Sequence, residues 1–421
     1  MQLTISLSQG LRHYWSYVTG FGYNARLFLW SSLLSGVTFA ISGLLLNFYL
    51  VSLGYRQDFL GLMASLTQLT TLIASLPAAM LSDAIGRKAA LVWGAIITAL
   101  AVLGLVVFTS TEGLIAMGVL YGIGTAIPIV VAAPFMMENS RPDERTHLFS
   151  ISFALQSAAG FAGGLMGGNL PEWLGGLFNV SARDARAYQA ALVVAAVVAA
   201  ATLVPLARLR SDPTAVRRTI RRPLTGVRAE GRLLFKLLFP NLLISLGAGL
   251  LIPFANVFLR ELYGVSDSEV GGLFSLAALV AGVAIALGPV LAQRFGKIRA
   301  VVGAQALSVP CLLIMGFSPI FPLAFVAYLF RTALMQMSGP IFNAYSMEVV
   351  QDETRATVSS LTSMVWTLGW VVSPIVSGQM QVRYGWLPII IMMAALYVAG
   401  IGLTHIYFGR SSVRVYAPEP P

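Results

Sequence analysis

Apolar residues fill this chain in long, nearly unbroken runs that are separated by short polar turns. A run of roughly 20 apolar residues, coiled into a helix, matches the hydrocarbon thickness of a lipid bilayer. Open strands cannot satisfy their backbone groups in lipid, so each run is predicted to be a membrane-spanning helix. Twelve such helices are predicted, over residues 28–53, 59–81, 89–109, 114–137, 147–169, 186–207, 239–260, 269–292, 299–318, 321–346, 357–380 and 386–408.

The composition agrees with a membrane protein. Hydrophobic residues make up 57% of the 421 residues and charged residues only 10%, whereas a soluble protein carries about 25% charged residues. The net charge of +10 could indicate nucleic-acid binding, but the Lys and Arg residues lie in short loops between apolar runs. Aromatic residues do not alternate with them to form a stacking platform, so no nucleic-acid partner is predicted.

The distribution of Lys and Arg predicts the orientation of the helices. With the N-terminus placed inside, 21 of the 27 Lys and Arg residues lie in inner segments, 5 lie in outer segments, and Arg331 lies within a span. This asymmetry predicts a multi-pass protein of the cell membrane with both termini in the cytoplasm. The sequence before the first span shows no cleavable signal pattern, and its aromatic residues suit the headgroup level.

The chain is predicted to have five parts: an interfacial N-terminal segment (1–27), a six-helix bundle (28–207), a basic cytoplasmic linker (208–238), a second six-helix bundle (239–408) and a cytoplasmic tail (409–421). The linker either binds anionic lipid headgroups of the inner leaflet or is simply a solvated loop that obeys the charge rule. The protein is expected to be a monomer.

The two halves repeat each other in sequence. A shift of 210 residues places Gly61 on Gly271, and a shift of 209 residues places Asn47 on Asn256. Parallel repeats of six helices, with a substrate site between them near the midplane, are one of the known plans of membrane transporters.

The turn between the second and third spans carries a polar motif, LPAAMLSDAIGRKAAL, over residues 76–91. Gly86 permits a tight turn, and Asp83 can accept hydrogen bonds from the cations that follow it or from a helix N-terminus. Arg87 and Lys88 alone would also fit simple positive-inside charge. In the second half Gln293 replaces the acid, so an electrostatic latch is expected at the first copy only.

Twelve spans in two similar halves, with this motif after span 2, resemble the major facilitator superfamily. The motif keeps Leu81, Asp83, Gly86, Arg87, Lys88 and Leu91, and it departs from the family pattern at Ala79 and Ala84. The resemblance implies an all-α membrane fold of two pseudo-symmetric six-helix bundles around a central cavity. It also implies that Asp83 latches the cytoplasmic side to span 11 when the outside is open. The expected cytoplasmic gate comprises Asp83, Gly86, Arg87, Lys88, Glu138, Arg145, Glu348 and Arg355.

Span 5 is rich in glycine, with Gly163, Gly164, Gly167 and Gly168 in the place where exporters of this superfamily carry GPxxGG. The pattern indicates either an exporter or ordinary close packing of helices. Within the predicted spans no Asp or Glu lies deep, so proton coupling is not expected unless an acid at a membrane edge, Asp58, Asp83 or Glu138, serves as the carrier.

Arg331 is the most unusual residue, because it lies roughly 15 Å into span 10 and an Arg at that depth is costly. It is expected either to bind an anionic or carbonyl-bearing group or to bond to helix carbonyls as a structural residue. Other polar and aromatic residues could line the same cavity or could join helices to each other. The candidate substrate-binding residues are Arg331, Asn47, Asn256, Gln68, Gln156, Gln336, Trp366 and Trp370.

The sequence thus predicts a transporter that moves a small amphipathic or anionic organic solute by alternating access, with export favoured. The alternatives are a uniporter or exchanger of organic anions or metabolites, and a membrane receptor or scaffold without transport. No cofactor or metal is predicted, since Cys311 is the only cysteine and the three histidines share no ligand spacing. No P-loop motif is present, and no catalytic constellation indicates an enzyme.

Overall fold

The computed structural model describes residues 20–142, 144–210, 231–351 and 354–409. Within these residues the regular structure is helical throughout, and they include no strand. The two ends of the bundle are named here by their loops. The linker face holds the turn at Gly86 and the ends of the segment that joins the halves, and the distal face is the opposite end, which holds the loop at residues 53–56.

The first half forms six spans, of which the sixth is broken at Thr202 into two helices. Its helices are α2 (Tyr23–Ser52), α3 (Gln57–Ile85), α4 (Arg87–Val107), α5 (Thr111–Glu138), α6 (Arg145–Leu177), α7 (Ala185–Ala201) and α8 (Leu203–Ala207).

The second half repeats this order, and its first span is broken near Pro253 by a short 3-10 turn. Its helices are α9 (Gly231–Leu251), η1 (Ile252–Phe254), α10 (Ala255–Tyr263), α11 (Asp267–Phe295), α12 (Lys297–Phe317), α13 (Phe321–Glu348), α14 (Arg355–Tyr384) and α15 (Leu387–Phe408). The predicted all-helical architecture of two six-helix bundles is therefore confirmed.

Several helices are longer than the apolar runs that predicted them. Helix α2 begins at Tyr23 rather than at residue 28, and α9 begins at Gly231 rather than at residue 239. These ends carry polar residues that a hydropathy boundary leaves out but that a helix tolerates at the headgroup level. The predicted basic linker lies mostly at residues 211–230, which are outside the described residues.

Eleven spans of the described chain are long and apolar enough to cross a membrane, and α13 is too polar to be among them. We count it as the remaining span, because its 28 residues would extend about 42 Å and it packs along α11 and α12.

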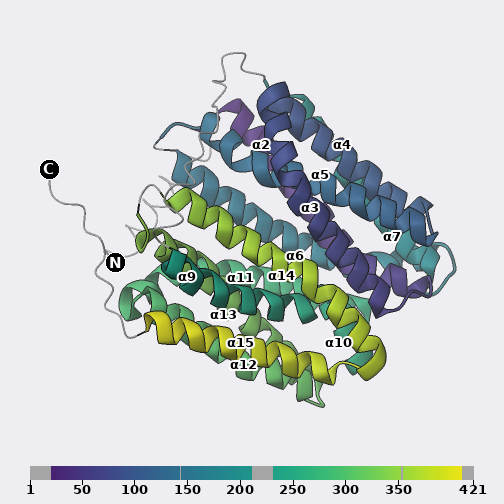
Figure 1. Ribbon diagram of the computed structural model, residues 1–421. Coiled ribbons are helices and arrows are strands. Elements are labelled where there is room, and N and C mark those ends of the chain that lie inside the picture. Colours follow the sequence, from purple (N-terminus) through teal and green to yellow (C-terminus); the bar gives the residue numbers. More distant parts are fainter. Residues whose placement is uncertain (1–19, 143, 211–230, 352–353, 410–421) are drawn as a thin grey trace, which may run out of the picture.

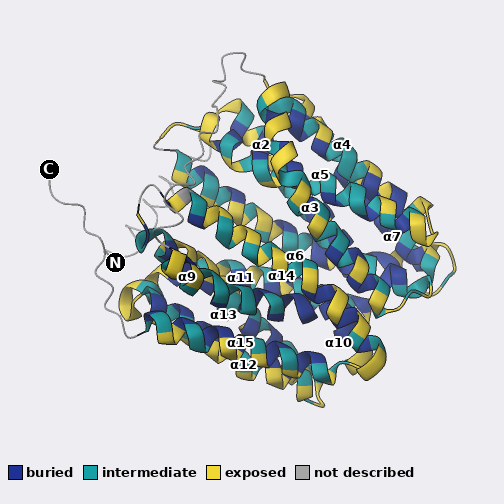
Figure 2. Cartoon of the chain, in the orientation of Figure 1, coloured by how far each residue is buried: buried dark blue, intermediate teal, exposed yellow. Residues whose placement is uncertain are grey.

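The two bundles lie side by side (Figure 1), with α2 to α7 in one group and α9 to α15 in the other. Exposed residues are scattered over their outer surfaces (Figure 2), as expected for helices that face lipid. Trp173 and Ile406 are examples of large apolar side chains that are exposed. Helices α3 and α6 of the first half pack against α14 and α11 of the second half, respectively, and so form the interface between the bundles.

Candidate functional site

The two halves meet along two seams that are rich in small residues. In the first seam, α6 of the first half packs against α11 of the second half. A Cβ atom added to Gly271 would lie 2.6 Å from the carbonyl oxygen of Gly164 and 2.6 Å from the Cα atom of Gly168. Both distances are below van der Waals contact, so the backbones can approach this closely only because these positions lack side chains.

The second seam, between α3 and α14, repeats the first with the sequence shift of 210. A Cβ atom on Gly61 would lie 2.2 Å from the carbonyl oxygen of Pro374, and one on Gly378 would lie 2.3 Å from that of Gln57. Gly61 corresponds to Gly271, and Pro374 corresponds to Gly164. The repeat that was read from the sequence is thus also a repeat of contacts between the halves.

Gly160, Gly164 and Gly168 lie four residues apart on one face of α6 and approach α11. Gly163 and Gly167 lie on another face and approach α2 within the same half. The glycine pattern of span 5 is therefore accounted for by close packing on two sides of one helix.

Asn47 and Asn256, which correspond under the shift of 209, contact each other directly. The side-chain nitrogen of Asn47 donates to the oxygen of the Asn256 side chain at 3.0 Å and to the carbonyl of Pro253 at 2.6 Å. Asn256 donates in turn to the carbonyl of Leu44 at 2.6 Å. Because residues 44 and 253 also correspond under this shift, the two hydrogen bonds are related by the pseudo-two-fold axis.

Four residues that the sequence analysis did not select form a distal cluster across the same interface: Phe48 and Tyr188 of the first half, and Arg260 and Asp267 of the second. The Tyr188 hydroxyl donates to Asp267 at 2.5 Å and accepts from Arg260 at 2.8 Å. Arg260 and Asp267 form an ion pair at 3.3 Å, and the Arg260 guanidinium lies 4.0 Å from the centroid of the Phe48 ring. Asp267 is only 7% exposed.

This cluster could not be recognised from the sequence, because Asp267 lies just outside the predicted span of residues 269–292 and Arg260 fits the pattern of an ordinary outer charge. The start of the other seam also carries a polar contact between the halves, since Gln57 donates to Glu261 at 2.8 Å. Asp267 and Gln57 are the first residues of α11 and α3 and correspond under the shift of 210.

The predicted gate residues at the linker face form separate clusters, one in each half. In the first half, Arg87 pairs with Asp83 at 2.7 Å and with Glu138 at 3.4 Å. In the second half, Lys297 pairs with Glu348. Gly86 joins α3 to α4 with a φ of +89°, a conformation that glycine adopts without strain. Lys88 is half-buried beside this turn.

Arg145 and Arg355 also lie in equivalent places. Arg145 donates to the carbonyl of Met137 at 3.5 Å, and Arg355 donates to that of Met347 at 2.8 Å. Both pairs are related by the shift of 210. Each Arg therefore ties the start of one helix to the end of the helix before it within its own half.

The remaining predicted binding residues fall into two groups. Gln156, Gln336 and Trp366 are exposed, and Gln68 and Trp370 are half-buried. Gln156 lies one helical turn from Gly160, on the seam face of α6, and Trp370 and Trp366 lie one and two turns from Pro374 on α14. These positions continue the two seams toward the linker face.

Arg331 lies inside the second bundle. It is 6% exposed and donates to the Tyr397 hydroxyl on α15 at 2.6 Å. Tyr397 is fully buried beside Gly247 of α9. The buried Nε atom of Arg331 has no hydrogen-bond partner among the described residues. The Arg331 guanidinium therefore keeps an N–H donor that could bind a ligand entering the bundle.

A model of the Major Facilitator Superfamily matches the chain twice, at residues 28–241 and 237–420. None of the curated proteins compared matches the sequence. The solved structures that resemble it include a bacterial homolog of the human lysosomal transporter Spinster in an inward-facing, unoccupied conformation (16% identity, TM-score 0.72, covering 91% of this chain and 94% of that one).

Two further structures are similar over nearly their full length. One is a mutant form of the nucleoside transporter NupG (15% identity, TM-score 0.75, covering 92% of this chain and 100% of that one). The other is the human organic anion transporter MFSD10 (16% identity, TM-score 0.61, covering 91% and 99%). At such identities the likeness shows the fold. With the family model matching both halves, the chain belongs to the Major Facilitator Superfamily and is a multi-pass membrane transporter rather than an enzyme.

Proposed function

We propose that this transporter exports a small amphipathic organic solute by alternating access, and that the structure is the state closed at the distal face. The observation that carries the proposal is the placement of the contacts between the halves. The hydrogen bonds of Asn47, Asn256, Tyr188 and Gln57 that cross the interface all lie toward the distal face.

The glycine contacts between the halves extend only partway along the seams. Along α11, the last of them toward the linker face is at Gly282, where an added Cβ atom would lie 3.0 Å from the Ser157 hydroxyl oxygen. Helix α11 continues for 13 residues beyond Gly282, to Phe295. The ion pairs at the linker face lie within each half. This arrangement fits two bundles that touch at one end and rock apart at the other.

The solute is proposed to bind where the seams end. Gln156 and Trp366 correspond under the shift of 210, and both are exposed within membrane-spanning helices. A glutamine at such a position is better accommodated by a water-filled space between the halves than by lipid. Together with Gln68, Gln336 and Trp370, it offers amide hydrogen bonds beside aromatic faces. These groups suit a solute that has both an apolar ring and a polar group.

The positive-inside rule predicts that the linker face is cytoplasmic, so the open end would receive the solute from inside. A second candidate, a uniporter or exchanger of organic anions, is favoured by the spare donor of Arg331 and by the likeness in fold to the organic anion transporter MFSD10.

The test is transport by the purified full-length chain in liposomes, with a panel of radiolabelled amphipathic cations, neutral aromatics and organic anions. Export of an amphipathic solute that is lost in Gln156→Ala and Trp366→Ala would support the proposal. Flux of anions alone, sensitive to Arg331→Gln, would replace it with the second candidate. Thr109→Ala, an exposed change at the distal face, is the matched control and should leave transport unchanged.

A further inference from the structure

The distal cluster joins the two halves through Asp267 and Arg260 of the second half, which contact Tyr188 and Phe48 of the first. When the halves separate at the distal face, Tyr188 must leave Asp267, and Arg260 must leave both Tyr188 and the ring of Phe48. The ion pair of Arg260 with Asp267 remains, because both residues belong to the second half. The contacts that depend on closure are therefore those made by Tyr188 and Phe48.

In the closed cluster Asp267 acts as an acceptor on both of its carboxyl oxygens. Its two oxygens face two donors, the Tyr188 hydroxyl at 2.5 Å and the Arg260 Nη1 atom at 3.3 Å. A protonated carboxyl has one acceptor fewer and adds a donor, and it would leave the cation of Arg260 buried without a counter-charge. A buried charge that has lost its partner is strongly destabilising.

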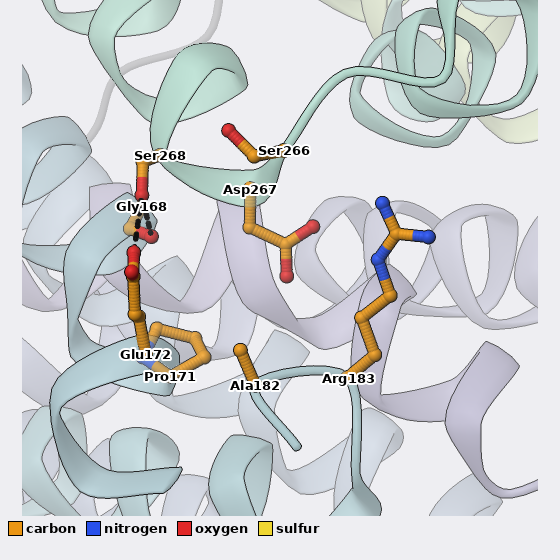
Figure 3. A pocket seen from close by; sticks show the side chains of 8 residues that line it. All are labelled: Gly168, Pro171, Glu172, Ala182, Arg183, Ser266, Asp267 and Ser268. Atoms are coloured by element: carbon orange, nitrogen blue, oxygen red, sulfur yellow. Dashed lines mark hydrogen bonds between the residues drawn. The ribbon is translucent and has the colours of Figure 1, made fainter. Parts of the chain in front are cut away.

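A small pocket of about 60 Å³ opens beside Asp267 at the distal end of the α6–α11 seam. Figure 3 shows Asp267 on one side of this pocket and Arg183, from the loop between α6 and α7, on the other. A space of this size can hold water, so it offers protons a path between the distal solution and the carboxylate.

The other charged groups near Asp267 have their own partners or are exposed. Glu172 on α6 accepts a hydrogen bond from Ser268 at 3.3 Å, and Arg183 is exposed. Glu269, on the same helix as Asp267, accepts from the backbone and hydroxyl of Ser266. The hydrogen bond of Glu172 also joins the two halves, whereas Glu269 accepts from Ser266 within its own half, so Glu269 provides the control for the role of Asp267.

We propose that Asp267 is a proton-binding latch of the distal face. Ionised, it accepts from Tyr188 and holds the halves together; protonated from the distal solution, it releases Tyr188 and lets the distal face open. The proton reaches and leaves Asp267 from the distal side only, so the latch regulates opening and carries no proton across the membrane. This proposal rests on the alternating access proposed above.

The test uses the full-length protein in lipid nanodiscs, with Cys311→Ala and spin labels at Thr109→Cys and Pro319→Cys. These two exposed distal positions correspond under the shift of 210 and belong to different halves. Acidification should lengthen the distance between the labels. Asp267→Asn should shift the ratio of open to closed protein at neutral pH by about tenfold or more and should remove the response to acid.

Tyr188→Phe keeps the ring and loses both hydrogen bonds, so it should also open the distal face, with little further effect when combined with Asp267→Asn. Glu269→Gln, an exposed change whose side chain accepts from Ser266 within the second half, should keep the closed distance and the response to acid. A closed, acid-sensitive Asp267→Asn protein with a normal size-exclusion profile would overturn the latch.

The failure of the latch and the failure of alternating access give different results. If Gly271→Ala, which weakens the seam directly, opens the distal face while Asp267→Asn does not, only the latch is wrong. If neither variant, nor acid, changes the distance between the labels, then the alternating-access proposal itself is wrong.

Discussion

The close approach of α6 and α11 at Gly271 gives the most direct test of how the halves meet. In Gly271→Ala the new Cβ atom would lie 2.6 Å from backbone atoms of both Gly164 and Gly168. Backbone atoms cannot relieve this overlap by a change of rotamer, as a side chain could. The helices must therefore separate by about 0.8 Å, the difference between 2.6 Å and an ordinary contact of 3.4 Å.

Overpacking of this kind typically costs about 1–3 kcal/mol. The cost falls on the state with the distal face closed, because the open state has no such contact. The ratio of open to closed protein should therefore rise by roughly 5- to 150-fold, the factor that corresponds to this free energy. The symmetry-related Gly61→Ala, whose Cβ atom would lie 2.2 Å from the carbonyl oxygen of Pro374, should have an effect of the same sign.

The measurement is the distance between spin labels at Thr109→Cys and Pro319→Cys, which should lengthen, and between labels at Ile85→Cys and Phe295→Cys, which should shorten. Ile85 and Phe295 are exposed equivalents at the linker face. Gly272→Ala is the matched control, since a Cβ atom there meets nothing within 4 Å. If Gly271→Ala and Gly272→Ala give the same distance distributions, the seam does not control closure.

Three other changes test separate parts of the molecule. Asn47→Ala and Asn256→Ala each remove one of the reciprocal hydrogen bonds, so each should raise the fraction of protein with an open distal face several-fold. The distance between the spin labels at the distal face measures this fraction, and unequal effects of the two variants would contradict the two-fold relation. Asp83→Asn should shift the protein toward the state open to the cytoplasm while Gln293→Ala does little, as measured by accessibility labelling at both faces. Tyr397→Phe removes the hydroxyl that accepts from the buried guanidinium of Arg331, so it should lower the free energy of unfolding in detergent by about 1–3 kcal/mol. An unchanged melting curve would contradict this prediction.

The fold and the repeat could be predicted from the sequence because both depend on local patterns. Apolar runs determine the spans, and a fixed shift of residue number reveals the duplication. The contacts at the linker face were partly predictable for the same reason, since Asp83 and Arg87 are four residues apart on the two sides of the tight turn at Gly86. The equivalence of Asn47 and Asn256 was also visible, but their contact was not, because sequence symmetry does not say where the axis passes.

The distal cluster could not be predicted, because Tyr188, Arg260 and Asp267 come from separate helices and each lies near a span end, where polar residues are expected. The partner of Arg331 was hidden in the same way: Tyr397 is 66 residues away on a helix that reads as uniformly apolar. An Arg in a span indicates that a polar partner exists, but only the packing of the helices identifies it.

The reciprocal bonds of Asn47 and Asn256 have the form of an isologous interface, in which each partner presents the same donor and the same acceptor. Asn47 reaches the carbonyl of Pro253, and Asn256 reaches that of Leu44. A surface of this kind is complementary to a second copy of itself. The first half of the chain thus carries, in Asn47 and Leu44, both groups that a symmetric pair of such halves would need to meet across a true two-fold axis.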